Sequence, residues 1–128
     1  MRTVKSIPII QLGTNLIVSI QVSLSDRLAL KLQDDIAQEI IKTGASGLVV
    51  DVSAVEIIDT FIARTLSDIS KNARTMGTMT VIVGLQPAVA MTLIEMGMEL
   101  EGVYTALDLD HGLEKIRKYK EIGNEEEN

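Results

Sequence analysis

Two short segments that are almost entirely apolar, "GLVVDVS" (47–53) and "MTVIVGL" (79–85), constrain the fold of this chain more than any other feature. They are rich in β-branched residues, and polar and apolar positions do not alternate along them. This pattern is typical of strands that are covered on both faces of a parallel sheet. Parallel neighbours need a long crossover, usually a helix, and the segment between these two strands can hold one. We therefore expect strand–helix–strand units with right-handed connections.

The segment between the two strands has the periodicity of an amphipathic helix. The helix is predicted to begin at about Thr60 and to end at Gly77, because glycine commonly follows the last turn of a helix. Its apolar side chains recur at intervals of three and four residues, which places them on one face. They are Ile62, Leu66, Ile69, Ala73 and Met76.

The part of the chain before the first buried strand predicts a hairpin followed by another amphipathic helix. Two β-rich runs, residues 7–13 and 15–22, flank a Gly-Thr-Asn sequence that suits a tight turn. Ser25 or Asp26 can cap the helix that follows, and Gly44 is expected to end it. One face of this helix is apolar at every fourth position: Leu28, Leu32, Ile36 and Ile40.

The part after the second buried strand predicts two helices with one more strand between them. Pro87 suits the first position of a helix, and Gly97 lies beyond the expected end of that helix. Residues 103–109 are predicted to form a last strand or extended segment. Asp110 can cap the closing helix. Two apolar side chains of that helix are expected to face inward, Leu113 and Ile116.

The expected order of elements is therefore β β α β α β α β α. This order predicts an α/β fold in which helices pack on a mixed, partly parallel sheet. Residues 1–122 are expected to form a single domain, because no linker or internal repeat interrupts them. Residues 123–128 include three consecutive glutamates and are expected to form a disordered acidic tail.

Composition and charge argue against nucleic acid and membranes as partners. The net charge is −6 and the aromatic residues are one Phe and two Tyr, whereas nucleic-acid binding favours basic stripes and stacking rings. No apolar run approaches the ~20 residues of a membrane span. The first residues lack the apolar stretch and cleavage site of a signal peptide. The absence of cysteine suits the cytoplasm, where we expect the protein.

Residues that could form a catalytic or metal site are scarce. The single histidine, His111, is expected to be a surface or capping residue, and no cluster of further ligands accompanies it. Asp34 and Asp35 are adjacent on a helix, so their side chains point in different directions. Neither the GxGxxG nor the GxxxxGK[ST] pattern occurs. The sequence therefore predicts a protein without catalytic activity, cofactor or metal ion.

The helix expected over residues 87–96 differs from the others because it is apolar on nearly all sides. Only Thr92 and Glu95 interrupt its apolar surface. Such a helix is either buried on all sides or buried in part against another chain, and both alternatives stay open. Methionine adapts to varied contact surfaces, and three methionines favour a contribution to an interface. They are Met91, Met96 and Met98.

The segment "EIIDTFIARTL" (56–66) places a hydroxyl at the start of the central helix. Asp59 is a good N-cap, and a structural cap alone would explain it. Thr60 would then lie in the first turn and face water. Phosphorylation of Thr60 would add about −1.5 to −2 charges, which the positive end of a helix tolerates. Arg64, four residues on, lies on the same face and can pair with the phosphate.

Several longer segments resemble a known family. The pattern of strand "GLVVDVSAVEIID", hydroxyl residue, helix and strand "TVIVGL" resembles the STAS domain, the sulfate transporter and anti-sigma factor antagonist fold. More closely, "IPIIQLGTNLIVSIQ", "DVSAVEIIDTFIA", "GLQPAVAMTLIEMG" and "TALDLDHGLEKIR" resemble the small scaffold proteins of the bacterial stressosome, the RsbS type. The resemblance runs from about residue 7 to residue 118, nearly the whole chain.

The resemblance implies a non-catalytic regulatory scaffold of a stress-response pathway. Scaffolds of this type assemble with RsbR-type STAS co-antagonists into a large cytoplasmic particle that holds an RsbT-type switch kinase. The kinase phosphorylates the hydroxyl after the "ID" pair and then leaves, and an RsbX-type phosphatase resets the scaffold. Thr60 occupies the acceptor position, with Asp59, Phe61 and Arg64 as the implied kinase-docking and phosphate environment. A homo-oligomer or a large hetero-assembly is expected accordingly.

One departure from the RsbS pattern and two alternative hypotheses bear on these expectations. RsbS-type scaffolds commonly have serine where this chain has Thr60, and threonine is more common in the co-antagonists. The alternative is a stand-alone anti-sigma factor antagonist, which binds a sigma-sequestering kinase outside any large particle. Such antagonists usually follow the acceptor with a small residue, so the bulky Phe61 disfavours them. A small-ligand or nucleotide-binding module is a third hypothesis, which no phosphate-cradle motif supports.

Overall fold

The computed structural model describes residues 6–95 and 103–127 of the protein. These residues form strands and helices in the predicted order. The elements are β1 (Ile9–Leu12), β2 (Asn15–Ser19), α1 (Asp26–Thr43), β3 (Gly47–Asp51), α2 (Thr60–Thr75), β4 (Met79–Val83), α3 (Pro87–Glu95), β5 (Tyr104–Ala106) and α4 (Leu109–Glu127).

The strands form one sheet in the order β1-β2-β3-β4-β5. β1 and β2 form an antiparallel hairpin, and the other neighbouring pairs are parallel. Val49 of β3 lies in register between Ile17 of β2 and Val81 of β4. The prediction of an α/β fold with a mixed, partly parallel sheet is therefore confirmed. The two apolar segments form β3 and β4, which each have a neighbour on both sides.

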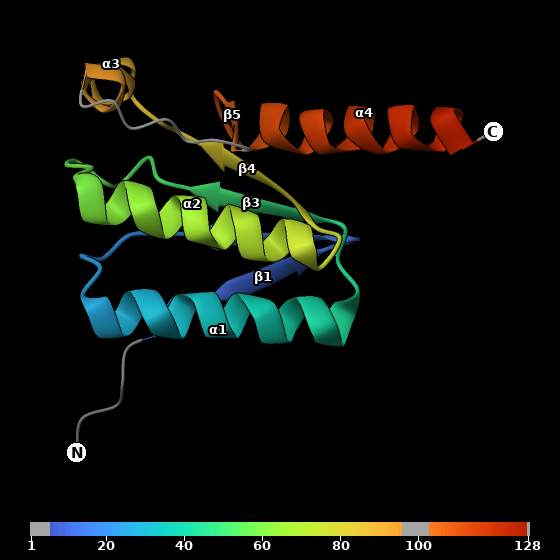
Figure 1. Cartoon of the computed structure of the whole chain (residues 1–128), viewed down its shortest axis with the longest axis horizontal. Helices are drawn as coiled ribbons and strands as arrows, with labels where there is room; N and C mark the ends of the chain where they lie inside the picture. The colour runs from blue at the N-terminus through green and yellow to red at the C-terminus, as the bar shows by residue number, and fades with distance from the viewer. Residues whose placement is uncertain (1–5, 96–102, 128) are drawn as a thin grey trace.

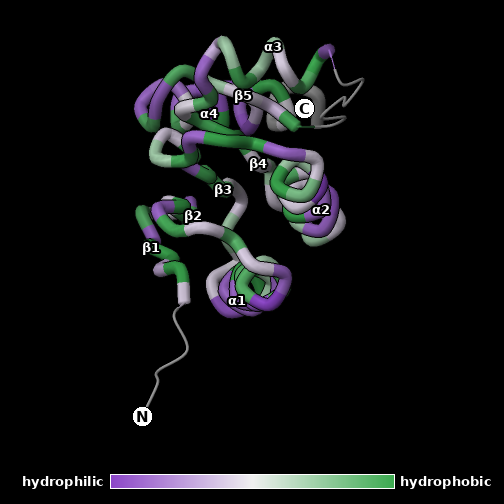
Figure 2. The backbone as a smooth tube through the Cα atoms, turned by 90° about the vertical axis from the view of Figure 1, so that its left-hand side faces the viewer, coloured by the Kyte–Doolittle hydropathy of each residue, from purple (hydrophilic) through white to green (hydrophobic). Residues whose placement is uncertain are grey.

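Helices cover both faces of the sheet (Figure 1, Figure 2). α1 and α2 lie side by side on one face, and α4 lies on the other face across β3, β4 and β5. Successive residues of β3 contribute to the cores on opposite faces of the sheet. Val50 belongs to the larger core under α1 and α2, whereas Val49 belongs to the smaller core under α4, together with Ile116. Burial on both faces explains why these strands show no alternation of polar and apolar residues.

The ends of α1 and α2 follow the predicted capping residues. The Ser25 Oγ accepts the backbone N–H of Leu28 at 3.1 Å, and Gly44 ends α1 with a φ of 67°. α2 begins at Thr60, directly after its cap Asp59. Most positions of the predicted apolar stripe of α2 are buried: Ile62, Leu66, Ile69 and Ala73.

The start of α4 differs from the prediction. Asp108 caps this helix rather than Asp110, since the Asp108 Oδ1 accepts the backbone N–H of His111 at 3.0 Å. A capping carboxylate lies before the first helical residue and bonds to the second or third residue beyond it, whereas Asp110 already lies inside the first turn.

The helical backbone continues to Glu127, so the acidic segment expected to be a disordered tail is helical up to that residue.

α3 is not buried on all sides. It lies beyond the end of β4 rather than across a face of the sheet (Figure 1). Leu93 is the one buried residue between Pro87 and Glu95, whereas Met91 and Ile94 are 57% and 69% exposed. The alternative that this helix is wholly core is therefore wrong, because only one of its sides meets the core. Three residues named in the predictions lie outside the described part of the chain: Met96, Gly97 and Met98.

Candidate functional site

The carboxyl ends of the parallel strands lie at one end of the molecule, together with the helix starts that follow them (Figure 1). The loop after β2 leads into α1, the loop after β3 into α2, and the loop after β4 into α3. Ligands of open α/β sheets commonly bind at this edge. The residues singled out in the sequence all lie here, at the start of α2: Asp59, Thr60, Phe61 and Arg64.

Asp59 fixes the start of α2 through both its side chain and its backbone. Its Oδ1 accepts the N–H of Ile62 at 2.9 Å, and its carbonyl oxygen accepts the N–H of Ala63 at 3.0 Å. Its backbone is extended, with φ −103° and ψ −176°, as an N-cap requires. The preceding residue, Ile58, is buried in the core and anchors the loop. The predicted cap is confirmed.

Thr60 is the first residue of α2, and its side chain is exposed. The first-turn N–H groups of a helix have no carbonyl partner within it, and they give this end a partial positive charge. An anion attached to the Thr60 oxygen would therefore lie in a favourable field. Thr60 is thus an exposed residue at the positive end of α2.

The two other residues singled out at this site differ in their surroundings. Phe61 is half-buried and packs against the core under α1 and α2, and its carbonyl oxygen accepts the hydroxyl of Thr65 at 2.9 Å. Arg64 is exposed, four residues after Thr60, so helical spacing places both on one face. Arg64 forms no ion pair within the described residues. Helical spacing thus places Arg64 and Thr60 on one exposed face, whereas Phe61 packs against the core.

A groove of about 440 Å³ lies beside the cap, between the loop after β2 and the loop after β3. Ile62 lines it from α2 and Asp59 from the cap before that helix, and Val22 and Ile57 line it from the two loops. Ile57 is 79% exposed and Val22 is 43% exposed. Exposed apolar side chains that gather beside a polar site commonly mark a contact with a partner. Sequence reasoning missed this groove, although two apolar residues in loops are the signal that could have indicated it.

A close contact between two loops ties the start of α3 to this end of the molecule. Gly84 follows β4 with a φ of 79°, and a Cβ at this position would lie 2.7 Å from the Cβ of Ser53. The Ser53 N–H in turn donates to the carboxylate of Asp51 at 2.9 Å. Only glycine suits both the backbone conformation and the close approach. A glycine directly after an apolar strand is the sequence signal for such a contact.

The described residues contain neither a metal-binding cluster nor a helix that could span a membrane. Across residues 6–95 and 103–127, no three His, Asp or Glu side chains converge to hold a metal ion. His111 is exposed at the start of α4, where its Nδ1 lies 2.6 Å from the Asp108 Oδ1, as expected of a surface or capping residue. Over the same described ranges, no helix combines the length and apolar character needed to cross a membrane.

Comparison with known proteins identifies the class. The STAS domain profile matches residues 6–109, which is most of the chain. The chain therefore belongs to the STAS domain family, as its sequence and its fold indicate.

Within this family the chain is similar to RsbS. It is 36% identical to a serine-to-glutamate variant of RsbS from Moorella thermoacetica, with a TM-score of 0.79 over 91% of this chain and 99% of that chain. A chain from the stressosome, described as a signal integration and transduction hub, is 37% identical, with a TM-score of 0.77 over 88% of this chain and 98% of that chain. The predicted resemblance to the RsbS type is confirmed.

The chain is also related to co-antagonist proteins. The RsbT co-antagonist protein RsbRA of Bacillus subtilis is 24% identical over 110 residues, which are 85% of this chain. This chain spans only 40% of the length of RsbRA.

Proposed function

We propose that this protein is a non-catalytic STAS scaffold that binds an RsbT-type switch kinase and releases it when Thr60 is phosphorylated. The observation that carries the proposal is the exposed Thr60 hydroxyl, held after the Asp59 cap in a chain similar to RsbS over 91% of its length. Similarity to the stressosome chain and to RsbRA supports assembly with RsbR-type co-antagonists into a large cytoplasmic particle. An RsbX-type phosphatase would return the scaffold to its starting state in this stress-response pathway.

The modification transfers the γ-phosphoryl group of ATP to Thr60. The bond between the γ-phosphorus and ADP breaks, a bond from the Thr60 Oγ1 to phosphorus forms, and a base of the kinase takes the hydroxyl proton. The scaffold contributes position and charge. Asp59 holds the first turn of α2 in place, and the positive helix end and the guanidinium of Arg64 meet the added negative charge.

The kinase docks over the groove beside the acceptor, where Ile57 and Val22 offer apolar contact area. The same arrangement explains release. A phosphate on Thr60 carries about −1.5 to −2 charges and lies next to Asp59, another anion. Docking would strip water from this phosphate, and burying a charge without new partners costs affinity. The phosphate on Thr60 therefore weakens the binding of the kinase that placed it there.

Phosphorylation by an RsbT-type kinase with ATP tests the acceptor. Mass spectrometry is expected to place the phosphate on Thr60, and incorporation is expected to vanish in Thr60→Ala. Thr75→Ala is the matched control, because Thr75 is an exposed threonine at the other end of α2 and should leave incorporation unchanged. Full incorporation into Thr60→Ala would overturn the assignment of Thr60.

Gel filtration with an RsbR-type protein tests the assembly. The scaffold is expected to elute with the co-antagonist as a particle far larger than either protein, and the kinase is expected to join it. A one-to-one complex with a kinase, without any particle, would instead identify a stand-alone anti-sigma factor antagonist.

A further inference from the structure

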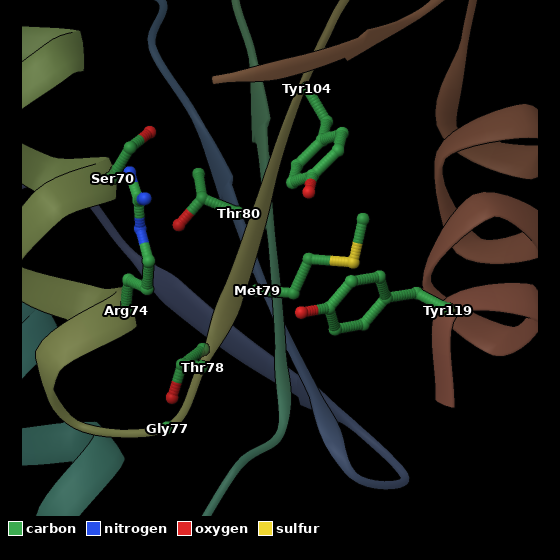
Figure 3. A pocket seen from close by; sticks show the side chains of 8 residues that line it. All are labelled: Ser70, Arg74, Gly77, Thr78, Met79, Thr80, Tyr104 and Tyr119. Carbon is green, nitrogen blue, oxygen red and sulfur yellow. The ribbon is translucent and has the colours of Figure 1, made fainter. Parts of the chain in front are cut away.

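A second cavity lies at the other end of α2, where β4 begins (Figure 3). Its volume is about 260 Å³. Thr78, Met79 and Thr80 line it, and they come before the ladder between β4 and β5, which begins at Val81 and Tyr104. Figure 3 shows two groups of side chains on opposite sides of β4. Ser70, Arg74 and Thr80 lie on the side of α2, and Met79, Tyr104 and Tyr119 lie on the side of α4.

Two hydroxyls that line this cavity are buried without a partner. Ser70 is 2% exposed and Thr80 is 4% exposed, and neither hydroxyl oxygen has a hydrogen-bond partner among the described residues. Native proteins leave few such groups unpaired, because an unpaired buried hydroxyl destabilises the fold. Thr78, beside them and equally buried, donates to the carbonyl oxygen of Ala45 at 2.8 Å. The hydroxyl of Thr78 thus has a hydrogen-bond partner within the fold, whereas those of Ser70 and Thr80 have none.

The charge of the cavity favours an anion. No aspartate or glutamate is among the residues that line it, although the whole chain has a net charge of −6. The guanidinium of Arg74 supplies the positive charge, and in the described part of the chain it forms no ion pair. A guanidinium binds a carboxylate through two parallel hydrogen bonds. The hydroxyls of Ser70 and Thr80 are enclosed and unpaired, so each still has a hydrogen that it can donate.

The other half of the cavity is apolar and aromatic. The rings of Tyr104 and Tyr119 lie with their centroids 6.1 Å apart, and the thioether of Met79 is beside them. Rings and sulfur favour an aromatic or aliphatic body. The volume is below the ~300–1,000 Å³ typical of sites for drug-sized ligands, so the occupant is smaller than these. We infer that this cavity binds a small organic carboxylate, with its carboxylate on Arg74, Ser70 and Thr80 and its apolar body against the two tyrosines.

Titration of the full-length protein with sodium benzoate tests this site. Saturable shifts are expected in the amide NMR signals of Ser70, Thr80 and Tyr104, with a dissociation constant on the order of 1 mM. Benzamide, a neutral analogue of the same shape, and inorganic phosphate, an anion without an apolar body, are both expected to bind at least roughly tenfold more weakly. Equal binding of either probe would overturn the inference, as would a lack of saturation with benzoate.

Substituting the two exposed arginines of α2, one at a time, distinguishes binding in the cavity from a general effect of positive charge. Arg74→Gln is expected to weaken benzoate binding at least tenfold. Arg64→Gln removes the same charge from the other end of α2 and should bind benzoate like the unaltered chain. Equal loss in both variants, or no loss in Arg74→Gln, would contradict the site.

A pair of threonine substitutions separates a ligand-binding hydroxyl from a structural one. Thr80→Val is expected to weaken benzoate binding without lowering the melting temperature, because the hydroxyl that it removes has no partner. Thr78→Val is expected to lower the melting temperature, because it leaves the Ala45 carbonyl oxygen without its donor. A melting temperature of Thr80→Val that falls as far as that of Thr78→Val would show that the Thr80 hydroxyl serves the fold, and would overturn the inference.

Discussion

Thr60 and Ser70 are hydroxyl residues of the same helix, yet α2 places them in opposite environments. Thr60 lies in the first turn, exposed, directly after the capping aspartate. Ser70 is 2% exposed, and its oxygen has no partner among the described residues. A kinase needs access to its acceptor, and a phosphate needs water or paired charges around it. Only the first position offers both. The environment of a hydroxyl, rather than its residue type, decides whether it can act as a switch.

The largest expected effect comes from a carboxylate placed at each of these positions. Ser70→Glu introduces a larger, charged side chain at a buried site, and we expect it to lower the free energy of unfolding by more than about 3 kcal/mol. Thr60→Glu should change it by less than about 0.5 kcal/mol, because the site is exposed and a helix start favours an acid. Urea unfolding measures both. Similar losses in the two variants would contradict the contrast between the two environments.

The next effect concerns the groove beside Thr60. Ile57→Ala is expected to weaken capture of an RsbT-type kinase roughly tenfold, because apolar anchors of an interface contribute about 1–2 kcal/mol or more. Ile41→Ala is the matched control, since Ile41 is 75% exposed in the last turns of α1. Surface plasmon resonance gives both affinities. A loss of equal size in the control, or none in Ile57→Ala, would exclude the groove as the docking surface.

A smaller effect is expected at the cap that presents Thr60. Asp59→Ala should lower the free energy of unfolding by about 1 kcal/mol, because the N–H of Ile62 loses its acceptor. Asp59→Asn keeps an acceptor oxygen and should retain most of this stability. Urea unfolding of the two variants compares them directly, and equal losses would show that the hydrogen bond does not stabilise the start of α2.

The smallest expected effect is a pH dependence at the second aspartate cap, Asp108. The backbone N–H of His111, and next its side chain, hydrogen-bond to this carboxyl and lower its pKa below the usual range. A pKa lowered by folding stabilises the protein above the usual Asp pKa, and this contribution is lost as the pH falls through the lowered value. His111→Ala keeps the backbone bond, so the Asp108 pKa should rise only partway. NMR titration of the carboxyl group measures it, and an unchanged pKa would exclude a role for the ring.

The fold was largely predictable because its main signals are local. The apolar runs of β3 and β4, and the stripe of α2, depend on residues within a few positions of one another. The cap at Asp59 was predictable for the same reason. The cap of α4 was misplaced because two aspartates, Asp108 and Asp110, lie within one turn, and only backbone geometry selects between them.

The rest could not be predicted because it depends on contacts between distant segments. Hydrophobicity does not show that α3 lies beyond the end of the sheet, where Met91 and Ile94 stay exposed. The groove beside Asp59 joins the loop that contains Val22 to the loop that contains Ile57. The cavity at the start of β4 likewise joins residues from α2, β4, β5 and α4. Such sites form only when the chain is folded.

The most direct test of release by phosphorylation is a comparison of two affinities. An RsbT-type kinase is bound to the unmodified protein and to the Thr60-phosphorylated protein, and both dissociation constants are measured under the same conditions. Phosphorylation is expected to weaken binding at least tenfold, which corresponds to about 1.4 kcal/mol or more. Equal affinity for the two forms would contradict release by phosphorylation, even if Thr60 proves to be the modified residue.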